Sequence, residues 1–351
     1  TPNNNFGGTY PQAHLPAGGG NELLPETAHS LPTRKGFASS LAVLDHAYAH
    51  QHFPEYIWEN ETPTPIAGNI GRPQAQRTVY AQDMFTERAL AALRRASTNA
   101  PLCMVVAYLL PHRQLVFPPG VNPYAHQPWP SNEQAFAAMI TKLDTDVGRL
   151  LDAIDAHPAL ASNTLVFFTS DNGPHAADGH APAFFNSAGG LRGMKFTLWE
   201  GGIRVPAIAR WPGRITAGAV QHAPCGFVDL CATVRDLAGA LPAASAACGD
   251  GVSIVPLFGG ATTLARTTPL IWYAPPGDNP RAPVAALRNN QWKFVLLADG
   301  TPELFNLDDD PAEHHTLTHR HDELVREYYR ALTQQVRQPL PPLRSSGATK
   351  P

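Results

Sequence analysis

The chain has 351 residues, 43% of them hydrophobic, which is enough to bury a full core and favours one large domain with a smaller one. Its formal net charge is only −3, with no dense cluster of lysine and arginine, so the sequence carries no electrostatic footprint for nucleic acid or an anionic membrane surface. No apolar run approaches the ~20 residues that a membrane span needs, and residues 1–20 lack the charged start and hydrophobic stretch of an export signal.

The first regular elements are expected after a long region of loops. Residues 1–80 contain Gly-rich and Pro-rich turns with little periodicity, which favours surface loops laid over a sheet rather than an independent domain. A helix is predicted over 82–95. An apolar strand is predicted over 102–110, and Pro111 ends it because proline has no backbone N–H to donate.

The clearest helix is predicted over 132–156, where apolar residues recur on one face and Asn132 can cap the start. A short strand over 164–169 follows and ends abruptly in a polar loop. Helix, strand and loop in this order predict an α/β fold with a mostly parallel or mixed sheet flanked by helices. Ligands of such sheets bind at the carboxyl ends of strands, so the loops at His112 and Asp171 are candidate sites.

The character of the chain changes in its last third. A helix is predicted from Phe227 to about Ala238, with Gly239 as its C-terminal cap. Short strands with turns and a terminal helix then predict a small α+β subdomain built on an antiparallel sheet. The strands are expected over 270–273, 284–287, 292–297 and 303–307, and the helix over 322–335. We set the boundary near Gly260, which divides the chain into domains 1–260 and 261–351.

The chain has four cysteines, which are Cys103, Cys225, Cys231 and Cys248. They are too few and too scattered for a disulfide framework, and no Cys-x-x-Cys pair suggests zinc. We therefore expect buried structural thiols. One disulfide within the stretch 225–248 remains the alternative, so the sequence leaves the redox compartment open.

The candidate metal ligands are Asp171 and Asn172, which place a carboxylate and an amide oxygen side by side at a strand end. Hard cations such as Ca²⁺ and Mg²⁺ prefer oxygen donors of this kind. Asp-Asn-Gly is also an ordinary turn sequence whose side chains bond to their own backbone. Taken alone, the motif favours the turn.

The sequence that follows changes this balance, because it resembles the second signature of the sulfatase family in the alkaline phosphatase superfamily. The signature segments are Phe184-Phe185-Asn186-Ser187, Leu191-Arg192-Gly193-Met194-Lys195, Glu200-Gly201-Gly202-Ile203-Arg204-Val205-Pro206 and Ala209-Arg210-Trp211-Pro212-Gly213. Further landmarks are Tyr48-Ala49-His50, Pro111-His112, Asp229-Leu230, Trp292-Lys293 and Glu303-Leu304-Phe305-Asn306-Leu307. The resemblance covers nearly the whole chain and implies an alkaline phosphatase-like fold.

The resemblance implies roles for a metal site and a sulfate contact. Asp171 and Asn172 match two ligands of a divalent metal ion, Ca²⁺ with Mg²⁺ as the alternative. Lys195 matches the lysine that contacts the sulfate oxygens, and a compact ammonium suits a group on which negative charge builds. Glu200 could be read as a catalytic acid, but we interpret 200–206 as a supporting segment with Arg204 in a structural ion pair.

Histidines complete the expected pocket. His112 matches the residue that binds sulfate or protonates the leaving oxygen, which imidazole can do near neutral pH. His14 matches a histidine of the sulfate pocket, although Gln12 stands where the family has a lysine. His175 is a candidate substrate contact, and His180 on the other side of the same loop is a weaker one.

The chain also departs from the family pattern. Family members begin with a strand that ends in paired aspartates, followed by a Cys-x-Pro-Ser-Arg or Cys-x-Ala-x-Arg signature whose cysteine becomes the formylglycine nucleophile. Neither the opening strand nor the signature is present in this sequence. Cys231 has Arg235 four residues later, but Thr233 breaks the motif, so we interpret Cys231 as a buried thiol. No nucleophile is assigned in this chain. We expect it on an upstream segment or on a complementing chain.

The implied activity is hydrolysis of sulfate esters, with a small aryl sulfate or a sulfated carbohydrate as substrate. A phosphoesterase of the same superfamily is one alternative, and a catalytically inactive remnant that binds an anion is another. The resemblance also implies a periplasmic or secreted protein.

Overall fold

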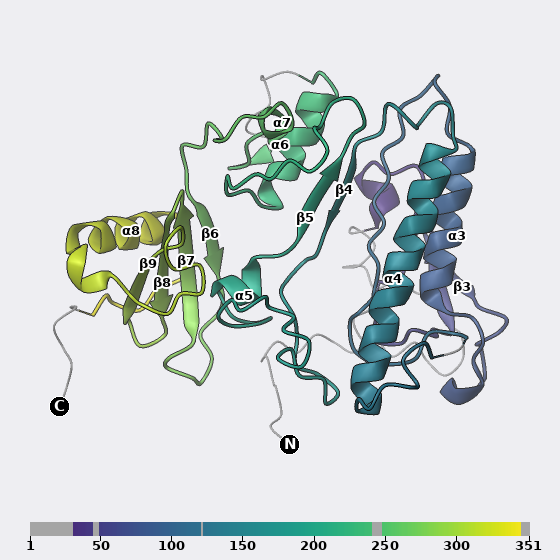
Figure 1. The fold of residues 1–351 in the computed structure, drawn as a ribbon, viewed down its shortest axis with the longest axis horizontal. Coiled ribbons are helices and arrows are strands. Elements are labelled where there is room, and N and C mark those ends of the chain that lie inside the picture. Colours follow the sequence, from purple (N-terminus) through teal and green to yellow (C-terminus); the bar gives the residue numbers. More distant parts are fainter. Residues whose placement is uncertain (1–30, 45–48, 121, 241–247, 345–351) are drawn as a thin grey trace. The chain divides into compact units, whose positions relative to one another are not determined.

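The computed structural model describes residues 31–44, 49–120, 122–240 and 248–344. The chain folds as two compact units (Figure 1). The first takes in the residues up to Thr164 together with Ala177–Ala181, and the second takes in Leu165–Ala176 and Pro182 onward. Among the described residues, no helix has both the length and the apolar content to cross a membrane. The division of the chain at residue 260 stays a prediction.

The first unit begins with a small antiparallel sheet where only loops are expected from the sequence. Its strands are β1 (Leu41–Ala42), β2 (Tyr56–Glu59) and β3 (Thr62–Pro65), in that order. Two short 3-10 helices, η1 (Pro32–Lys35) and η2 (Gln74–Gln76), lie in the same region. The prediction of loops is wrong for these strands, because two to four residues are too few to show an alternating pattern.

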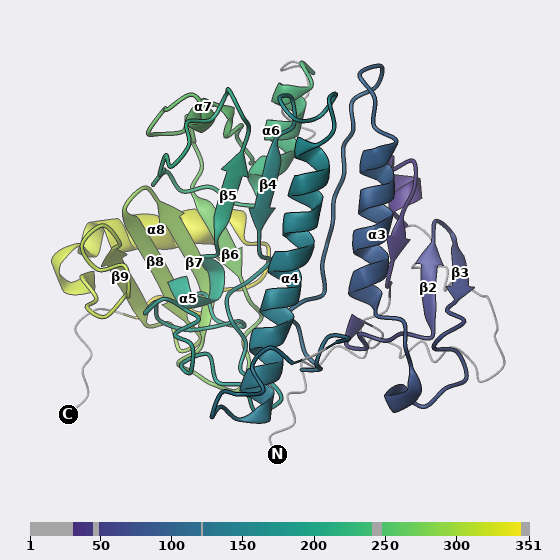
Figure 2. The ribbon, with the colours of Figure 1, turned by 45° about the vertical axis from the view of Figure 1, so that its right-hand side comes forward.

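The two predicted helices of this unit are confirmed as α3 (Ala81–Arg94) and α4 (Ser131–Asp155), which run alongside each other (Figures 1 and 2). Lys142 of α4 joins them, with its Nζ 2.6 Å from an oxygen of Asp83 on α3 and 2.7 Å from buried Asp146. The predicted cap is wrong: Pro130 occupies the N-cap position and Asn132 lies inside the first turn.

The predicted strand over 102–110 is not formed, because these residues pair with no strand in the described part of the chain. Val105 is 70% exposed and Leu102 is 44% exposed. An apolar run of this length satisfies the sequence criterion for a buried strand, but a strand needs a hydrogen-bonded neighbour to form. The Leu110–Pro111 bond that follows the segment is cis.

The second unit begins with β4 (Val166–Thr169), which confirms the predicted strand before Asp171 and pairs antiparallel with β5 (Ala207–Arg210). The short helix α5 (Glu200–Ile203) precedes β5. Helix α6 (Val228–Leu237) confirms the next prediction, and Gly239 has the expected positive φ of 67°. Helix α7 (Val255–Phe258) follows. Every strand pair in the described ranges is antiparallel, so the parallel neighbours expected for an α/β sheet do not occur among them.

The antiparallel sheet predicted for the last third of the chain is confirmed. Its strands are β6 (Leu270–Tyr273), β7 (Pro283–Asn289), β8 (Trp292–Leu297) and β9 (Pro302–Asn306), in that order. The 3-10 helix η4 (Thr318–Arg320) leads into the terminal helix α8 (Asp322–Gln335), which has the predicted bounds and covers one face of the sheet (Figure 1).

The two faces of this sheet have different partners because side chains alternate along each strand. Phe294, Leu296 and Leu304 pack with α8 residues on one face. Val295 and Leu297 pack on the other face with Leu198, and Trp199 and Ile203 lie against the same cluster. The second face therefore carries the segment that leads into α5.

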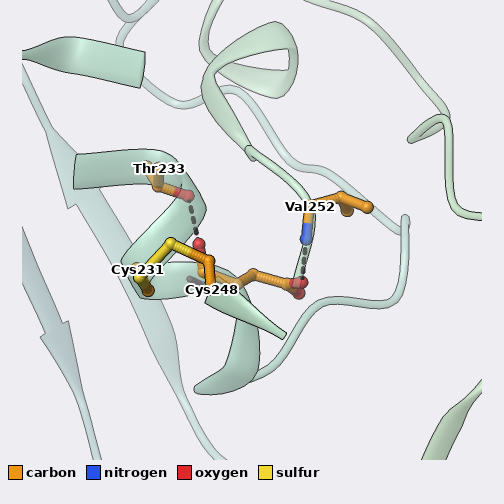
Figure 3. Close-up of a disulfide and its surroundings, with 5 residues drawn as sticks. Cys231, Thr233, Cys248 and Val252 are labelled. Carbon is orange, nitrogen blue, oxygen red and sulfur yellow. Dashed lines mark hydrogen bonds between the residues drawn. A yellow bond between two sulfur atoms is a disulfide. The ribbon is translucent and has the colours of Figure 1, made fainter. Parts of the chain in front are cut away.

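A disulfide joins Cys231 of α6 to Cys248, with the two Cα atoms 5.4 Å apart (Figure 3). The expectation of buried thiols is wrong for this pair, and the alternative of a disulfide within 225–248 is confirmed. It is also wrong for Cys103 and Cys225, which are exposed free cysteines. Sequence spacing alone cannot show which sulfur atoms approach each other.

Buried Asp229 fixes the same region. Its carboxylate accepts a hydrogen bond from the Val252 N–H at 2.9 Å, and its backbone oxygen accepts one from Thr233 at 2.7 Å (Figure 3). Arg266 adds an ion pair at 2.6 Å. Bonds of this kind hold α6 against the segment that begins at Cys248.

Replacement of both disulfide cysteines, Cys231→Ser with Cys248→Ser, should lower the free energy of unfolding by about 3 kcal/mol, because the bridge closes a loop with a sequence separation of 17. Urea unfolding of the double variant measures the loss. Cys103→Ser is the control for removing a thiol and should leave the unfolding free energy unchanged. Equal unfolding free energies for the double variant and the unreduced parent would contradict the assignment of this disulfide.

Candidate functional site

The strand-end loop, residues 170–175, follows β4 directly and carries the predicted metal ligands. Asp171 is exposed and Asn172 is half-buried. The Ser170 hydroxyl donates to the Asn172 backbone oxygen at 3.1 Å, and Asn172 Nδ2 donates to the Gly173 oxygen at 3.0 Å. These local bonds are those of a turn, and they engage the nitrogen end of the Asn172 amide.

The oxygen atoms of this loop are of the chemical type that binds a hard cation. The Asp171 carboxylate and Asn172 Oδ1 are ligand atoms that Ca²⁺ and Mg²⁺ prefer, and Ca²⁺ takes about six to eight of them. Two donors make up only part of such a shell. Within the described ranges, no place gathers three or more His, Cys, Asp or Glu residues that could hold a metal ion. Other oxygen atoms would have to complete the coordination.

The lysine loop, residues 191–199, lies against the strand-end loop and is bonded to it through the backbone. The Lys195 N–H donates to the Pro174 oxygen at 2.8 Å. The Gly173 N–H donates to the Gly202 oxygen at 3.0 Å, and the Gly201 N–H donates to the Arg192 oxygen at 2.7 Å. The predicted metal ligands and Lys195 are therefore carried on two segments that hold each other in place.

Glycine is required where these segments meet. A Cβ atom on Gly173 would lie 1.9 Å from the Gly201 oxygen, and one on Gly201 would lie 2.4 Å from the Gly193 oxygen. A Cβ on Gly202 would lie 2.2 Å from the Thr197 oxygen. Backbone atoms cannot swing away as a flexible side chain can. A larger residue at Gly173 would therefore push the strand-end loop away from α5, and one at Gly201 or Gly202 would push α5 away from the lysine loop.

Phe196 brings two predicted site residues together. The His175 ring meets the Phe196 ring edge-on with 5.2 Å between centroids, and Lys195 Nζ lies 5.4 Å from the same ring. Phe196 is 57% exposed and has a φ of 74°, a conformation that a bulky side chain rarely adopts. Strained backbone of this kind clusters at functional sites.

Strand β9 supports the lysine loop through Glu303. The carboxylate accepts a hydrogen bond from Trp199 Nε1 at 2.9 Å and pairs with the Arg192 guanidinium at 3.1 Å. That guanidinium also stacks over the Trp199 ring, 4.0 Å from its centroid. The sequence shows Arg192 and Glu303 only as separate family landmarks, 111 residues apart, with no sign of their pairing.

A buried ion cluster anchors α5 on strand β8. Lys293 Nζ is fully buried and lies 2.8 Å from a Glu200 oxygen and 2.9 Å from a Glu313 oxygen. Burial raises the pKa of Glu313 despite the opposing pull of Lys293. Arg204 contacts Glu200 at 3.8 Å. The predicted ion pair of Arg204 is therefore formed, and the interpretation of 200–206 as a supporting segment stays a prediction.

Two of the remaining predicted histidines belong to the first unit. His112 belongs to the first unit, where its Nδ1 lies 2.9 Å from the Arg113 oxygen and its ring stacks on His50. His180 is buried and its Nδ1 lies 2.7 Å from the Glu133 carboxylate, so it has a structural role in the same unit. His14 falls outside the described residues.

The structure thus brings Asp171, Asn172, His175 and Lys195 together within the second unit. His50 and His52 have no predicted role, and they contact His112 through its ring and its backbone oxygen. His50 ends the Tyr48-Ala49-His50 landmark and His52 follows two residues later, which is the signal that could have found them.

An oxygen-donor loop at a strand end thus lies beside a loop that carries a lysine. Residues 30–240 match the sulfatase family, and residues 194–340 match the family described as N-sulphoglucosamine sulphohydrolase, C-terminal. The chain belongs to the sulfatase family.

Two curated relatives show how far the similarity extends. Arylsulfatase A of Bos taurus is 34% identical over 230 residues, which cover 59% of this chain and 43% of the relative. Arylsulfatase G of Rattus norvegicus is 32% identical over 257 residues, which cover 65% of this chain and 46% of the relative. The chain therefore spans less than half the length of these relatives.

A solved structure confirms the fold class. The crystal structure of Ps i-CgsB matches with a TM-score of 0.71 at 24% identity, covering 89% of this chain and 68% of that one. The same protein has also been solved in complex with k-i-k-neocarrahexaose. At this level of identity the likeness establishes the alkaline phosphatase-like fold and leaves the substrate open.

The substitution Gly173→Ala should lower the free energy of unfolding by about 1–3 kcal/mol, because the added methyl would meet the Gly201 oxygen at 1.9 Å. Gly148→Ala is the matched control: it lies inside α4, an added methyl there would meet nothing within 4 Å, and the change should stabilise by up to about 1 kcal/mol. Urea unfolding of both variants gives the comparison. Equal effects would show that the loops need no close contact.

The substitution Lys293→Met should lower the free energy of unfolding by about 3–5 kcal/mol at neutral pH, because it leaves two buried carboxylates without their cation. The loss should shrink as the pH falls below the raised pKa of Glu313, since a protonated carboxyl needs no cation. Chemical unfolding across this pH range measures both effects. Arg344→Ala, which removes an exposed ion pair with Asp299, should cost less than about 1 kcal/mol.

Proposed function

We propose that the protein to which this chain belongs hydrolyses sulfate esters, with the strand-end loop and the lysine loop forming one side of its sulfate pocket. The observation that carries the proposal is the direct backbone bonding between these loops. It couples the oxygen donors of Asp171 and Asn172 to the cation of Lys195. A sulfate group needs both a metal ion and a fixed positive charge, because negative charge builds on its oxygens during transfer.

Asp171 and Asn172 would hold the divalent metal, Ca²⁺ with Mg²⁺ as the alternative. When bound, the metal would polarise the sulfuryl group as a Lewis acid. Lys195 directs a compact ammonium at the sulfate oxygens, and the Phe196 ring beside it limits the positions that the long side chain adopts. His175 packs against the same ring and contacts the bound ester.

His112 donates the proton that the leaving alcohol needs. Its Nδ1 lies 2.9 Å from the Arg113 backbone oxygen, to which it donates, so Nε2 is the nitrogen that exchanges the proton. His14 joins the sulfate contacts. No residue of this chain is assigned as the nucleophile, which we assign to a formylglycine on an upstream segment or a complementing chain.

The proposed substrate is a sulfated carbohydrate, with an aryl sulfate as the alternative. One solved structure of similar fold is in complex with its substrate D-Glucosamine-2-N, 6-O-disulfate, which supports the sulfated carbohydrate. A periplasmic or secreted location accords with substrates of that kind. We also propose that residues 1–260 form the catalytic α/β domain and residues 261–351 a smaller subdomain that supports it.

Hydrolysis of 4-nitrophenyl sulfate in the presence of Ca²⁺ tests the proposal, using the chain expressed together with the coding sequence that adjoins it. Lys195→Ala should lower kcat/KM by about 10²–10³-fold, because it removes a cation that stabilises the transferring group. Lys35→Ala removes a lysine that is exposed in the first unit and should leave kcat/KM unchanged.

Two results would contradict this function. Faster turnover of 4-nitrophenyl phosphate than of the sulfate would identify a phosphoesterase. Binding of inorganic sulfate without turnover of either ester would identify a non-catalytic anion-binding protein.

A further inference from the structure

The hydrogen bond of His112 determines which of its ring nitrogens can exchange a proton. Nδ1 lies 2.9 Å from the Arg113 backbone oxygen. A carbonyl oxygen only accepts, so Nδ1 carries a hydrogen and donates it. In the neutral ring Nε2 is then unprotonated. His112 therefore gains and loses its proton at Nε2.

Two other histidines restrain this ring and its backbone. The His50 ring stacks on the His112 ring with centroids 4.9 Å apart and planes 16° from parallel. His52 Nε2 lies 3.1 Å from the His112 backbone oxygen, to which it donates. His52 is 2% exposed, and burial lowers its pKa, so it is a neutral donor near neutral pH. His50 thus limits rotation of the His112 ring, and His52 holds the His112 main chain.

The rest of the His112 loop is fixed by the same surroundings. The Gln114 N–H donates to the His50 oxygen at 3.4 Å, and the Leu115 N–H donates to Asp178 at 3.2 Å. The charged and titratable groups that surround His112 on these elements are His50, His52, Arg113 and Asp178, of which Arg113 and Asp178 form an ion pair at 3.2 Å. All of them belong to the first unit.

We propose that His50 and His52 are positioning residues, which hold the His112 ring in the Nδ1–H tautomer and so make Nε2 the nitrogen that exchanges its proton. This inference rests on the proposed role of His112 as proton donor. The proton donor is the protonated ring, which carries a hydrogen on both nitrogens. As the oxygen of the nucleophile bonds to sulfur and the ester S–O bond breaks, the electron pair of the broken bond stays on the leaving oxygen, and that oxygen takes the proton from Nε2. His112 is then neutral and still carries the hydrogen on Nδ1.

The first test observes the tautomer directly and needs no activity. The chain is labelled with ¹⁵N-histidine, and His112→Gln identifies the signals of residue 112. We expect neutral His112 to show the Nδ1–H form in the parent and a mixture with the Nε2–H form in His50→Ala. His50→Phe keeps a flat ring against His112 and should retain the parent tautomer. His319→Ala, which removes an exposed histidine outside this loop, should change nothing.

His52 is examined through a matched pair of variants because it is buried. His52→Gln keeps an N–H donor for the His112 oxygen and should retain the Nδ1–H form, whereas His52→Phe removes the donor and should lose it. Identical His112 signals in the parent, His50→Ala and His52→Phe would overturn the proposal.

The second test measures rates on two esters, using the chain expressed with its adjoining coding sequence. A proton donor matters most for a poor leaving group. His50→Ala should therefore lower kcat/KM for an alkyl sulfate by about tenfold or more, and clearly less for 4-nitrophenyl sulfate. Equal losses on both esters would overturn the positioning role. If the parent hydrolyses no sulfate ester, the proposed function fails, while the tautomer measurement still decides whether His50 and His52 position His112.

Discussion

The candidate site depends on one close approach of backbone to backbone, between the strand-end loop and the segment around α5. Gly173, Gly201 and Gly202 leave room for carbonyl oxygens where a Cβ atom would lie only 1.9–2.4 Å from one. The backbone hydrogen bonds of this contact, from Lys195 to Pro174 at 2.8 Å and from Gly173 to Gly202 at 3.0 Å, fix the loop of Lys195 relative to the loop of Asp171. A site that relied on side-chain contacts alone would lose more entropy on binding an anion, because each long side chain would have to be ordered.

The close approach is in turn held by the antiparallel sheet. Lys293 on β8 forms an ion pair with α5, and Glu303 on β9 forms one with the lysine loop. Leu198 and Trp199 pack on the apolar face of the same strands. The sheet contributes no predicted ligand or catalytic group. Its contribution is to hold both ends of the lysine loop, which explains why a chain segment so distant in sequence belongs to the site.

Periodic elements could be predicted from the sequence, whereas contacts between distant segments could not. Helix α8 has the predicted bounds because its apolar residues repeat at helical spacing and Asp322 marks its start. The apolar run over 102–110 shows the limit of such patterns, since it carries the composition of a strand and no described partner. The pairing of Cys231 with Cys248 likewise depends on how α6 lies against a later segment. The roles of Asp171 and Lys195 are predicted from the family resemblance and not from a periodic pattern of residues.

Two lysines of this site illustrate why residue type alone does not determine role. Lys293 is fully buried between two carboxylates, so its charge holds α5 in place and is closed to an incoming anion. Lys195 extends over the face of the half-exposed Phe196 ring, an apolar surface that strengthens the attraction of its ammonium for an anion by excluding water. Both belong to family landmarks in the sequence. Only their surroundings separate the structural cation from the one that we propose contacts a sulfate group.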